Sequence, residues 1–145
     1  MDSGPPETGS PETGAPETGG CLCGAVRFAA TGRPSRVGLC HCLDCRKHHG
    51  APFHAAATFP AQAVTLSGET RAWGDRHFCP ACGSPVFGHF GDEIGLNLGA
   101  FDRPGAFRPS YELWTIRREP WLAALPQAHQ YEGDRPGPGR SEDWP

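Results

Sequence analysis

Residues 79–83 read Cys79-Pro80-Ala81-Cys82-Gly83, which is the pattern of a tight turn between two cysteines. The proline tightens the turn, and the glycine lets the backbone wrap close to sulfur. Two thiolates held in this way supply half of a tetrahedral zinc site. The chain must therefore provide two further ligands from another segment.

Cys21 and Cys23 are the natural second pair. They stand two residues apart, so both side chains lie on one face of an extended segment. Together with the pair in residues 79–83 they complete four thiolates. We expect Cys21, Cys23, Cys79 and Cys82 to form a closed, structural zinc site that joins distant parts of the domain.

The remaining three cysteines, Cys40, Cys42 and Cys45, lie within six residues. Three thiolates so close together can bind a second zinc ion and leave its fourth position open, which is how catalytic zinc differs from structural zinc. A competing arrangement pairs two of these three with residues 79–83 and places Cys21 and Cys23 elsewhere. Spacing alone does not exclude it.

Disulfides are the other common use of clustered cysteines. Seven is an odd number, and the N-terminus has no apolar signal-peptide core. We therefore expect a cytoplasmic protein with reduced thiols and about two zinc ions per chain.

Length and composition predict one small domain, residues 21–132, between two tails. Residues 1–20 repeat Pro-Glu-Thr-Gly three times and are acidic, so we expect them to be disordered. Residues 133–145, rich in proline, glycine and charge, are expected to be flexible. Positions 21–145 hold 13 basic and 12 acidic residues, which argues against a nucleic-acid footprint. No apolar run is long enough to span a membrane.

Short alternating runs predict a mainly β domain. The expected strands cover residues 25–29, 53–59, 85–90, 94–101 and 111–116, and residues 60–64 are the expected helical turn. Strands this short leave a modest core, so metal sites would supply part of the folding energy.

The cysteine motifs, with Cys21–Phe28, Cys40–Lys47, Phe78–Ser84 and Glu112–Trp114, resemble the glutathione-dependent formaldehyde-activating (GFA) family, which includes centromere protein V. The resemblance runs from about residue 20 to about 131. It implies a small β-tent fold of short antiparallel sheets, a closed zinc site, and a second zinc that glutathione can approach. The stretch between Val64 and Arg76 is shorter than in many relatives.

A thiol that enters an open zinc position is held as its thiolate and can add to a carbonyl. Because three thiolates already outweigh the charge of Zn²⁺, Arg46 and Lys47 are candidates to offset the added charge. Gly50 and Phe53 are candidate substrate contacts, since a small-residue turn admits a ligand and an aromatic ring can wall a pocket.

Several histidines follow the second cysteine motif. His41 stands between two expected ligands and should point away from them, while His48, His49 and His54 could each coordinate or move protons. The aromatic residues Trp73, Trp114 and Trp121 are expected in the core or in a lid. Asp44 and Glu112 receive no catalytic role.

Three classes of function are compatible with this pattern. The first is a carbon–sulfur lyase acting on adducts of glutathione or a similar small thiol with an aldehyde. The second is a non-catalytic zinc module that binds a macromolecule, and the third is a thiol or metal sensor. Oligomeric state is not predicted.

Overall fold

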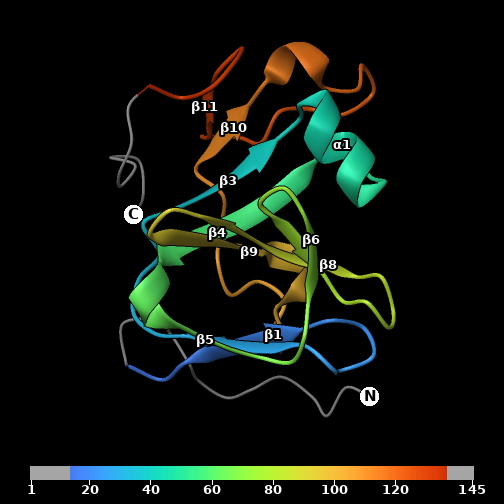
Figure 1. Ribbon diagram of the computed structural model, residues 1–145. Helices are drawn as coiled ribbons and strands as arrows, with labels where there is room; N and C mark the ends of the chain where they lie inside the picture. The colour runs from blue at the N-terminus through green and yellow to red at the C-terminus, as the bar shows by residue number, and fades with distance from the viewer. Residues whose placement is uncertain (1–13, 137–145) are drawn as a thin grey trace.

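Two β-sheets and one α-helix make up residues 14–136, the part of the chain that the computed structural model describes (Figure 1). The strands are β1 (Glu17–Gly20), β2 (Arg27–Ala30), β3 (Arg36–Cys40), β4 (His54–Pro60), β5 (Val64–Ser67), β6 (Arg71–Trp73), β7 (Arg76–Phe78), β8 (Pro85–Phe90), β9 (Glu93–Asn97), β10 (Tyr111–Leu113) and β11 (His129–Gln130). The helix is α1 (Leu43–His49), and 3₁₀ turns cover Ala61–Ala63, Leu98–Ala100 and Thr115–Arg117. The predicted mainly β class is confirmed.

The two sheets differ in their pairing. The smaller sheet has the order β1-β2-β5 and is antiparallel. The larger has the order β11-β10-β3-β4-β9-β8-β7-β6, and its β10 runs parallel to both β3 and β11. The expectation of antiparallel sheets alone is wrong at this edge. The long connection after β9 returns the chain to the end where β3 begins, and Ser110 N–H donates to the Val37 carbonyl at 3.0 Å as β10 starts.

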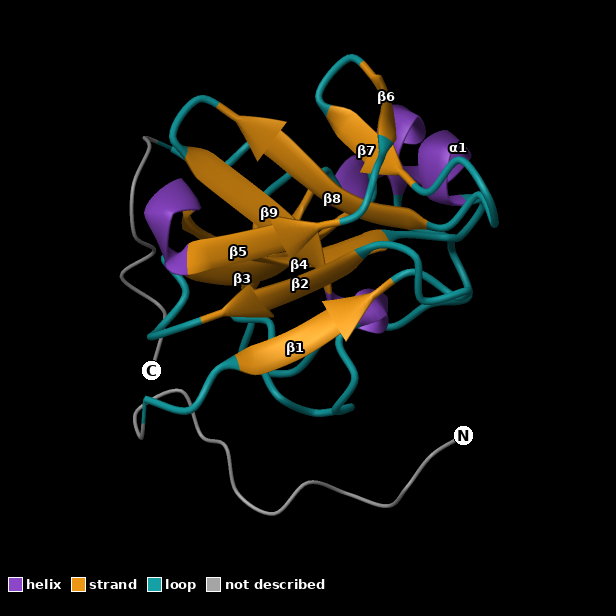
Figure 2. Cartoon of the chain, turned by 60° about the horizontal axis from the view of Figure 1, so that its bottom comes forward, coloured by secondary structure: helices purple, strands orange, loops and turns teal. Residues whose placement is uncertain are grey.

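Aromatic side chains from both sheets and from the loop after β9 meet in the core. The ring of Phe101 lies 5.0 Å from that of Phe28 and 5.3 Å from that of Phe107, which in turn lies 5.8 Å from Phe59. All three pairs are edge-to-face, an arrangement worth about 0.5–1.5 kcal/mol beyond the area it buries. The core therefore ties the small sheet to the large one. Figure 2 shows the small sheet (β1, β2 and β5) in front of strands of the large one.

The N-terminal boundary lies earlier than expected. The third Pro-Glu-Thr-Gly repeat forms β1, in which Glu17 is ion-paired with Arg103 and the Thr18 hydroxyl donates to Asp102 at 2.7 Å. Gly19 is packed so closely that a Cβ there would lie 2.3 Å from the Ala100 carbonyl oxygen. Residues 17–20 are thus part of the fold and not of a disordered tail, because Glu17 and Thr18 have specific side-chain partners and Gly19 is closely packed. Residues 1–13 lie outside the described residues.

The fold also extends further toward the C-terminus than predicted. Trp114 N–H donates to the Gly133 carbonyl at 3.0 Å, and the Trp114 indole N–H donates to Asp134 at 2.9 Å. Residues 133 and 134 therefore belong to the fold, and the prediction that the flexible tail starts at 133 is wrong there. Residues 137–145 lie outside the described residues.

Local structure departs from the sequence-based expectation in a few places. The helical turn expected at residues 60–64 is confirmed as Ala61–Ala63. The strands expected to reach 101 and 116 end sooner, at Asn97 and Leu113, and pass into 3₁₀ turns.

Trp73 is 77% and Trp121 69% exposed, so neither is a core residue. No helix among residues 14–136 has the length and apolar character needed to cross a membrane.

The α-helix was not predicted. It begins at Leu43 directly after Cys42, whose Sγ accepts the Cys45 N–H at 3.3 Å as an N-cap. It ends at Gly50, which adopts the left-handed conformation (φ 59°) that glycine tolerates best. Only Cys45 of the helix is buried, so the segment lacks the apolar periodicity by which helices are recognised.

Candidate metal centres

All seven cysteines are free thiols, and they gather into two groups. We call them the four-thiol group and the three-thiol group. In each group the sulfur atoms all lie within 4.8 Å of one another. The members are Cys21, Cys23, Cys79 and Cys82 in the first group, and Cys40, Cys42 and Cys45 in the second. The competing arrangement, which mixes the two groups, does not occur.

Two loops build the four-thiol group. Cys21 and Cys23 follow β1, and the Val26 N–H donates to Cys21 Sγ at 3.2 Å. Cys79 follows β7, and its sulfur accepts the Ala81 N–H at 3.3 Å, while Gly83 N–H closes the turn on the Cys79 carbonyl at 2.8 Å. Burial opposes ionisation of Cys21, but hydrogen bonds from the Val26 N–H, Cys23 and Cys79 outweigh it and lower the pKa of this thiol, which favours the thiolate form that a metal requires.

The sulfur spacing fits a tetrahedral ion. With a Zn–S bond of about 2.3 Å, two ligands of a regular tetrahedron stand about 3.8 Å apart. Cys21 Sγ lies 3.7 Å from Cys23 Sγ, which lies 3.8 Å from Cys79 Sγ. The donor set and its dimensions therefore suit zinc, and a site of this kind is complete without further ligands.

Three different local structures position the three-thiol group. Cys40 is the last residue of β3, Cys42 is the N-cap of α1, and Cys45 lies in the first turn of the helix. The strand end and the helix start thus bring three sulfur atoms together within six residues. No histidine or carboxylate of the described chain completes this group within the same 4.8 Å spacing. A tetrahedral ion bound by these three sulfur atoms would have a fourth position that no histidine or carboxylate of the described chain fills.

The pKa values of the three thiols in this group are shifted in opposite directions, down for Cys45 and up for Cys40 and Cys42. Hydrogen bonding from Cys40, with a further contribution from His54, lowers the pKa of Cys45 to about 3. The same hydrogen bond, together with burial, raises the pKa of Cys40, and burial raises that of Cys42. Arg76 also faces Cys45, with its Nη2 3.8 Å from Sγ.

His41 points away from the thiols, as expected. Its ring is 0% exposed, and Nε2 lies 2.7 Å from Oε1 of Glu112 on β10, which is 1% exposed. Burial opposes ionisation of Glu112, but hydrogen bonds from the Leu125 N–H, Gln130 and His41 outweigh it and lower the pKa of the carboxyl. This buried pair braces the chain between Cys40 and Cys42 from behind, a role that the sequence did not suggest for Glu112.

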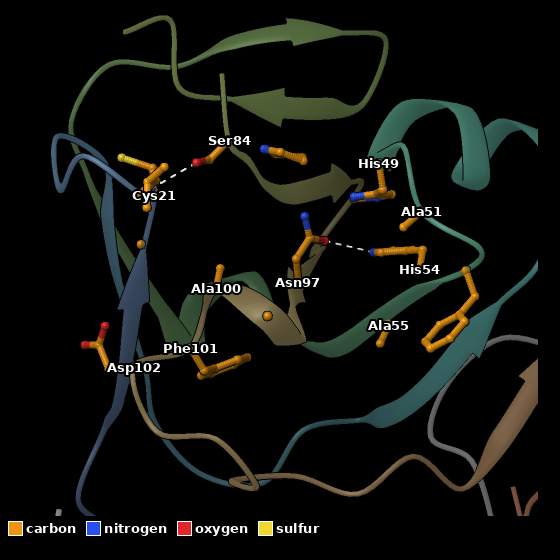
Figure 3. A pocket seen from close by; sticks show the side chains of 15 residues that line it. Cys21, His49, Ala51, His54, Ala55, Ser84, Asn97, Ala100, Phe101 and Asp102 are labelled. Atoms are coloured by element: carbon orange, nitrogen blue, oxygen red, sulfur yellow. Dashed lines mark hydrogen bonds between the residues drawn. The ribbon is translucent and has the colours of Figure 1, made fainter. Parts of the chain in front are cut away.

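The other histidines form a row beside the three-thiol group. The rings of His49 and His54 are stacked 4.2 Å apart, and His48 packs edge-on against His49 at 4.8 Å. His54 Nε2 lies 2.9 Å from Asn97 Oδ1, which fixes its ring (Figure 3). Burial and the neighbouring histidines lower the pKa of His49 to about 4. All three histidines line the small cavity with Cys45, and His54 is the one that lowers the pKa of Cys45 by hydrogen bonding.

The four residues predicted to contact substrate lie in different surroundings. Arg46 is bound to Glu119 at 2.6 Å and to the Pro52 carbonyl at 3.2 Å, so its guanidinium braces the helix against the loops. Lys47 lies beside an outer pocket of about 330 Å³. Phe53 lines a larger pocket, described next, whereas Gly50 ends the helix.

Two cavities adjoin the histidine row. The large pocket, about 620 Å³, runs from Cys21 and Ser84 at one end to His49 and His54 at the other (Figure 3), and Phe53 also lines it. The small cavity, about 180 Å³, is bounded by Cys45 and Arg76, by Phe87 and Phe90, and by the same histidines. His49, His54 and Asn97 form the wall that the two share. Sequence reasoning missed Asn97 and Arg76, and the only available signal was the position of Arg76 three residues before Cys79.

Comparisons with known proteins identify the family. No curated protein matches the chain. A crystal structure of a Rhodobacter sphaeroides protein is similar, with 24% sequence identity and a TM-score of 0.45, over 57% of this chain and 85% of that one. The model of the family described as glutathione-dependent formaldehyde-activating enzyme (GFA) matches residues 16–117, more than half of the chain. The resemblance seen in the cysteine motifs is confirmed, and the chain belongs to the GFA family.

Proposed function

We propose that this chain is a zinc-dependent carbon–sulfur lyase that acts on adducts of glutathione, or of a similar small thiol, with an aldehyde. The observation that supports the proposal is the three-thiol group, which offers three ligands and no fourth within the described chain. The four-thiol group is proposed as structural zinc, so that each chain binds about two zinc ions. The same need for reduced thiols underlies our proposal of a cytoplasmic location.

The proposed reaction cleaves the carbon–sulfur bond of the adduct. In a thiol–aldehyde adduct the carbon carries both sulfur and a hydroxyl group. Cleavage breaks the carbon–sulfur bond, sulfur keeps the electron pair, the hydroxyl loses its proton, and a carbon–oxygen double bond forms. The products are a thiolate, an aldehyde and a proton, and the reverse direction forms the adduct. A zinc ion with one open position supplies a Lewis acid that stabilises the thiolate.

The chain's own residues bind and orient the reactants in this proposal. The large pocket has the volume for a tripeptide-sized thiol, and its wall of His49, His54 and Asn97 separates it from the small cavity that Cys45 lines. Phe53 gives the pocket an apolar wall. Asn97 fixes the ring of His54, so the polar part of the wall is preorganised.

The test is a titration of cobalt-substituted protein with glutathione, followed by the absorption of the cobalt ions. A sulfur–cobalt charge-transfer band should grow with glutathione and not with S-methylglutathione, which has the same shape but no thiol. Cys42→Ser, which keeps the four-thiol group intact, should abolish the response. A wild-type protein that responds to no small thiol would refute the lyase proposal and favour the binding module or the sensor.

A further inference from the structure

Arg76 stands apart from the other arginines of the described chain in what it contacts. Carboxylates take up the guanidinium groups of many of them, among them Arg36 with Glu93 at 2.8 Å and Arg46 with Glu119 at 2.6 Å. Arg76 is only partly exposed, and its Nη2 donates instead to Cys45 Sγ at 3.8 Å. A half-buried cation is therefore directed at the three-thiol group and not at a carboxylate.

The position of Arg76 connects that group to the outside. It is the first residue of β7, next to the turn of the β6–β7 hairpin. Its side chain lines the small cavity together with Cys45, and it also lines the outer pocket together with Lys47 and Trp73. A ligand that reached Cys45 through the small cavity would contact the guanidinium, and a thiol bound in the large pocket would reach it across the shared wall of His49, His54 and Asn97.

We propose that Arg76 is the residue that binds the thiolate of the incoming substrate at the three-thiol group. This inference rests on the proposed function and adds to it a specific recognition residue. A guanidinium carries five N–H donors, so one can hold Cys45 while others reach a second sulfur. The added cation would offset the charge of a fourth thiolate, which three cysteine thiolates otherwise repel.

Arg76 takes the role that the sequence indicated for Arg46 and Lys47. Arg46 is committed to Glu119 and to the Pro52 carbonyl. Lys47 is exposed, lines the outer pocket and makes no contact with the thiols. Lys47 carries the same charge as Arg76 on the same side of the molecule, which makes it a matched control.

The experiment compares Arg76→Gln, Arg76→Lys and Lys47→Gln with the wild type, all cobalt-substituted. The dissociation constant of glutathione is measured from the cobalt charge-transfer band, and the cobalt content of each variant is measured alongside. We expect Arg76→Gln to weaken glutathione binding about 10- to 100-fold, as for the loss of a charge-assisted contact. Arg76→Lys should recover part of the loss, and Lys47→Gln should change binding less than about threefold.

The outcomes separate this inference from the proposed function. If the wild type binds glutathione and both glutamine variants bind it within threefold of the wild type, Arg76 is not the thiolate contact and the lyase proposal stands. Loss of cobalt from Arg76→Gln and also from Arg76→Lys would show a purely structural role and overturn the inference. A wild type that binds no thiol overturns both.

Discussion

Replacing Glu112 with glutamine tests whether the buried carboxylate on β10 holds the chain behind the three-thiol group. Oε1 of Glu112 lies 2.7 Å from His41 Nε2, and Oε2 accepts the Leu125 N–H at 2.6 Å and the Gln130 amide at 3.1 Å. The amide of a glutamine would have to point its NH₂ at one of these donors. An NH₂ group turned toward Leu125 and Gln130 would face two donors, and one turned toward His41 would require the imidazole to change tautomer so that Nε2 accepts; in both cases the buried network loses its negative charge.

The expected loss follows from the burial of the carboxylate. Removing one partner of a buried, charged hydrogen-bonded network costs about 3–5 kcal/mol. At about 3–5 °C per kcal/mol for a domain of this size, the melting temperature should fall by about 10–20 °C. Glu119→Gln is the control, because its pair with Arg46 is about a quarter exposed and should contribute less than about 1 kcal/mol.

Urea unfolding of the zinc-loaded proteins measures the free energy directly, and calorimetry gives the melting temperature. Cobalt absorption then reports whether the three-thiol group keeps its ion in Glu112→Gln. A loss below about 1 kcal/mol, equal to that of Glu119→Gln, would refute the view that Glu112 braces the site.

The remaining predictions concern acid, zinc and the first strand. Folding lowers the pKa of the Glu112 carboxyl, so the carboxylate stabilises the protein above the unfolded pKa of about 4.3, and this stabilisation is lost as pH falls through the folded pKa. The difference in unfolding free energy between wild type and Glu112→Gln should therefore narrow below about pH 4. A difference that stays constant with pH in urea unfolding would contradict this. Cys79→Ser should unfold the chain, whereas Cys42→Ser should stay folded and lose half of the zinc in metal analysis; equal behaviour would remove the division between the two groups. Gly19→Ala should cost about 1–3 kcal/mol in urea unfolding because its Cβ would meet Ala100 and Phe28, while Gly99→Ala, which meets nothing within 4 Å, should be near neutral; similar losses would argue against the close packing of β1.

Cysteine spacing predicted which thiols lie together, and the structure contains two groups with the same members. The prediction was possible because ligand spacing is a local property: a CxC on an extended segment and a CPxCG turn each determine where two sulfur atoms lie. Strands β2, β4, β8, β9 and β10 were predictable for the same reason, from alternation within a few residues. The other strands of the described residues, β1, β3, β5, β6, β7 and β11, were not predicted, because most of them are only two to four residues long and show too little alternation.

Features that depend on distant partners could not be predicted. Helix α1 depends on a cysteine as its N-cap, and the parallel pairing of β10 depends on the course of the long connection before it. Arg76 and Glu112 look like ordinary surface charges until the fold places them against Cys45 and His41. Their roles are matters of tertiary contact, which local sequence patterns do not carry.

The third Pro-Glu-Thr-Gly copy is the one that forms β1, and this has a consequence for how the gene can vary. Deleting one five-residue unit from the array leaves another Pro-Glu-Thr-Gly directly before Gly20 and Cys21. That copy would supply the same glutamate, threonine and glycine to Arg103, Asp102 and Ala100. The number of repeats can therefore change at no cost to the strand, provided that one intact copy followed by a glycine adjoins the first cysteine.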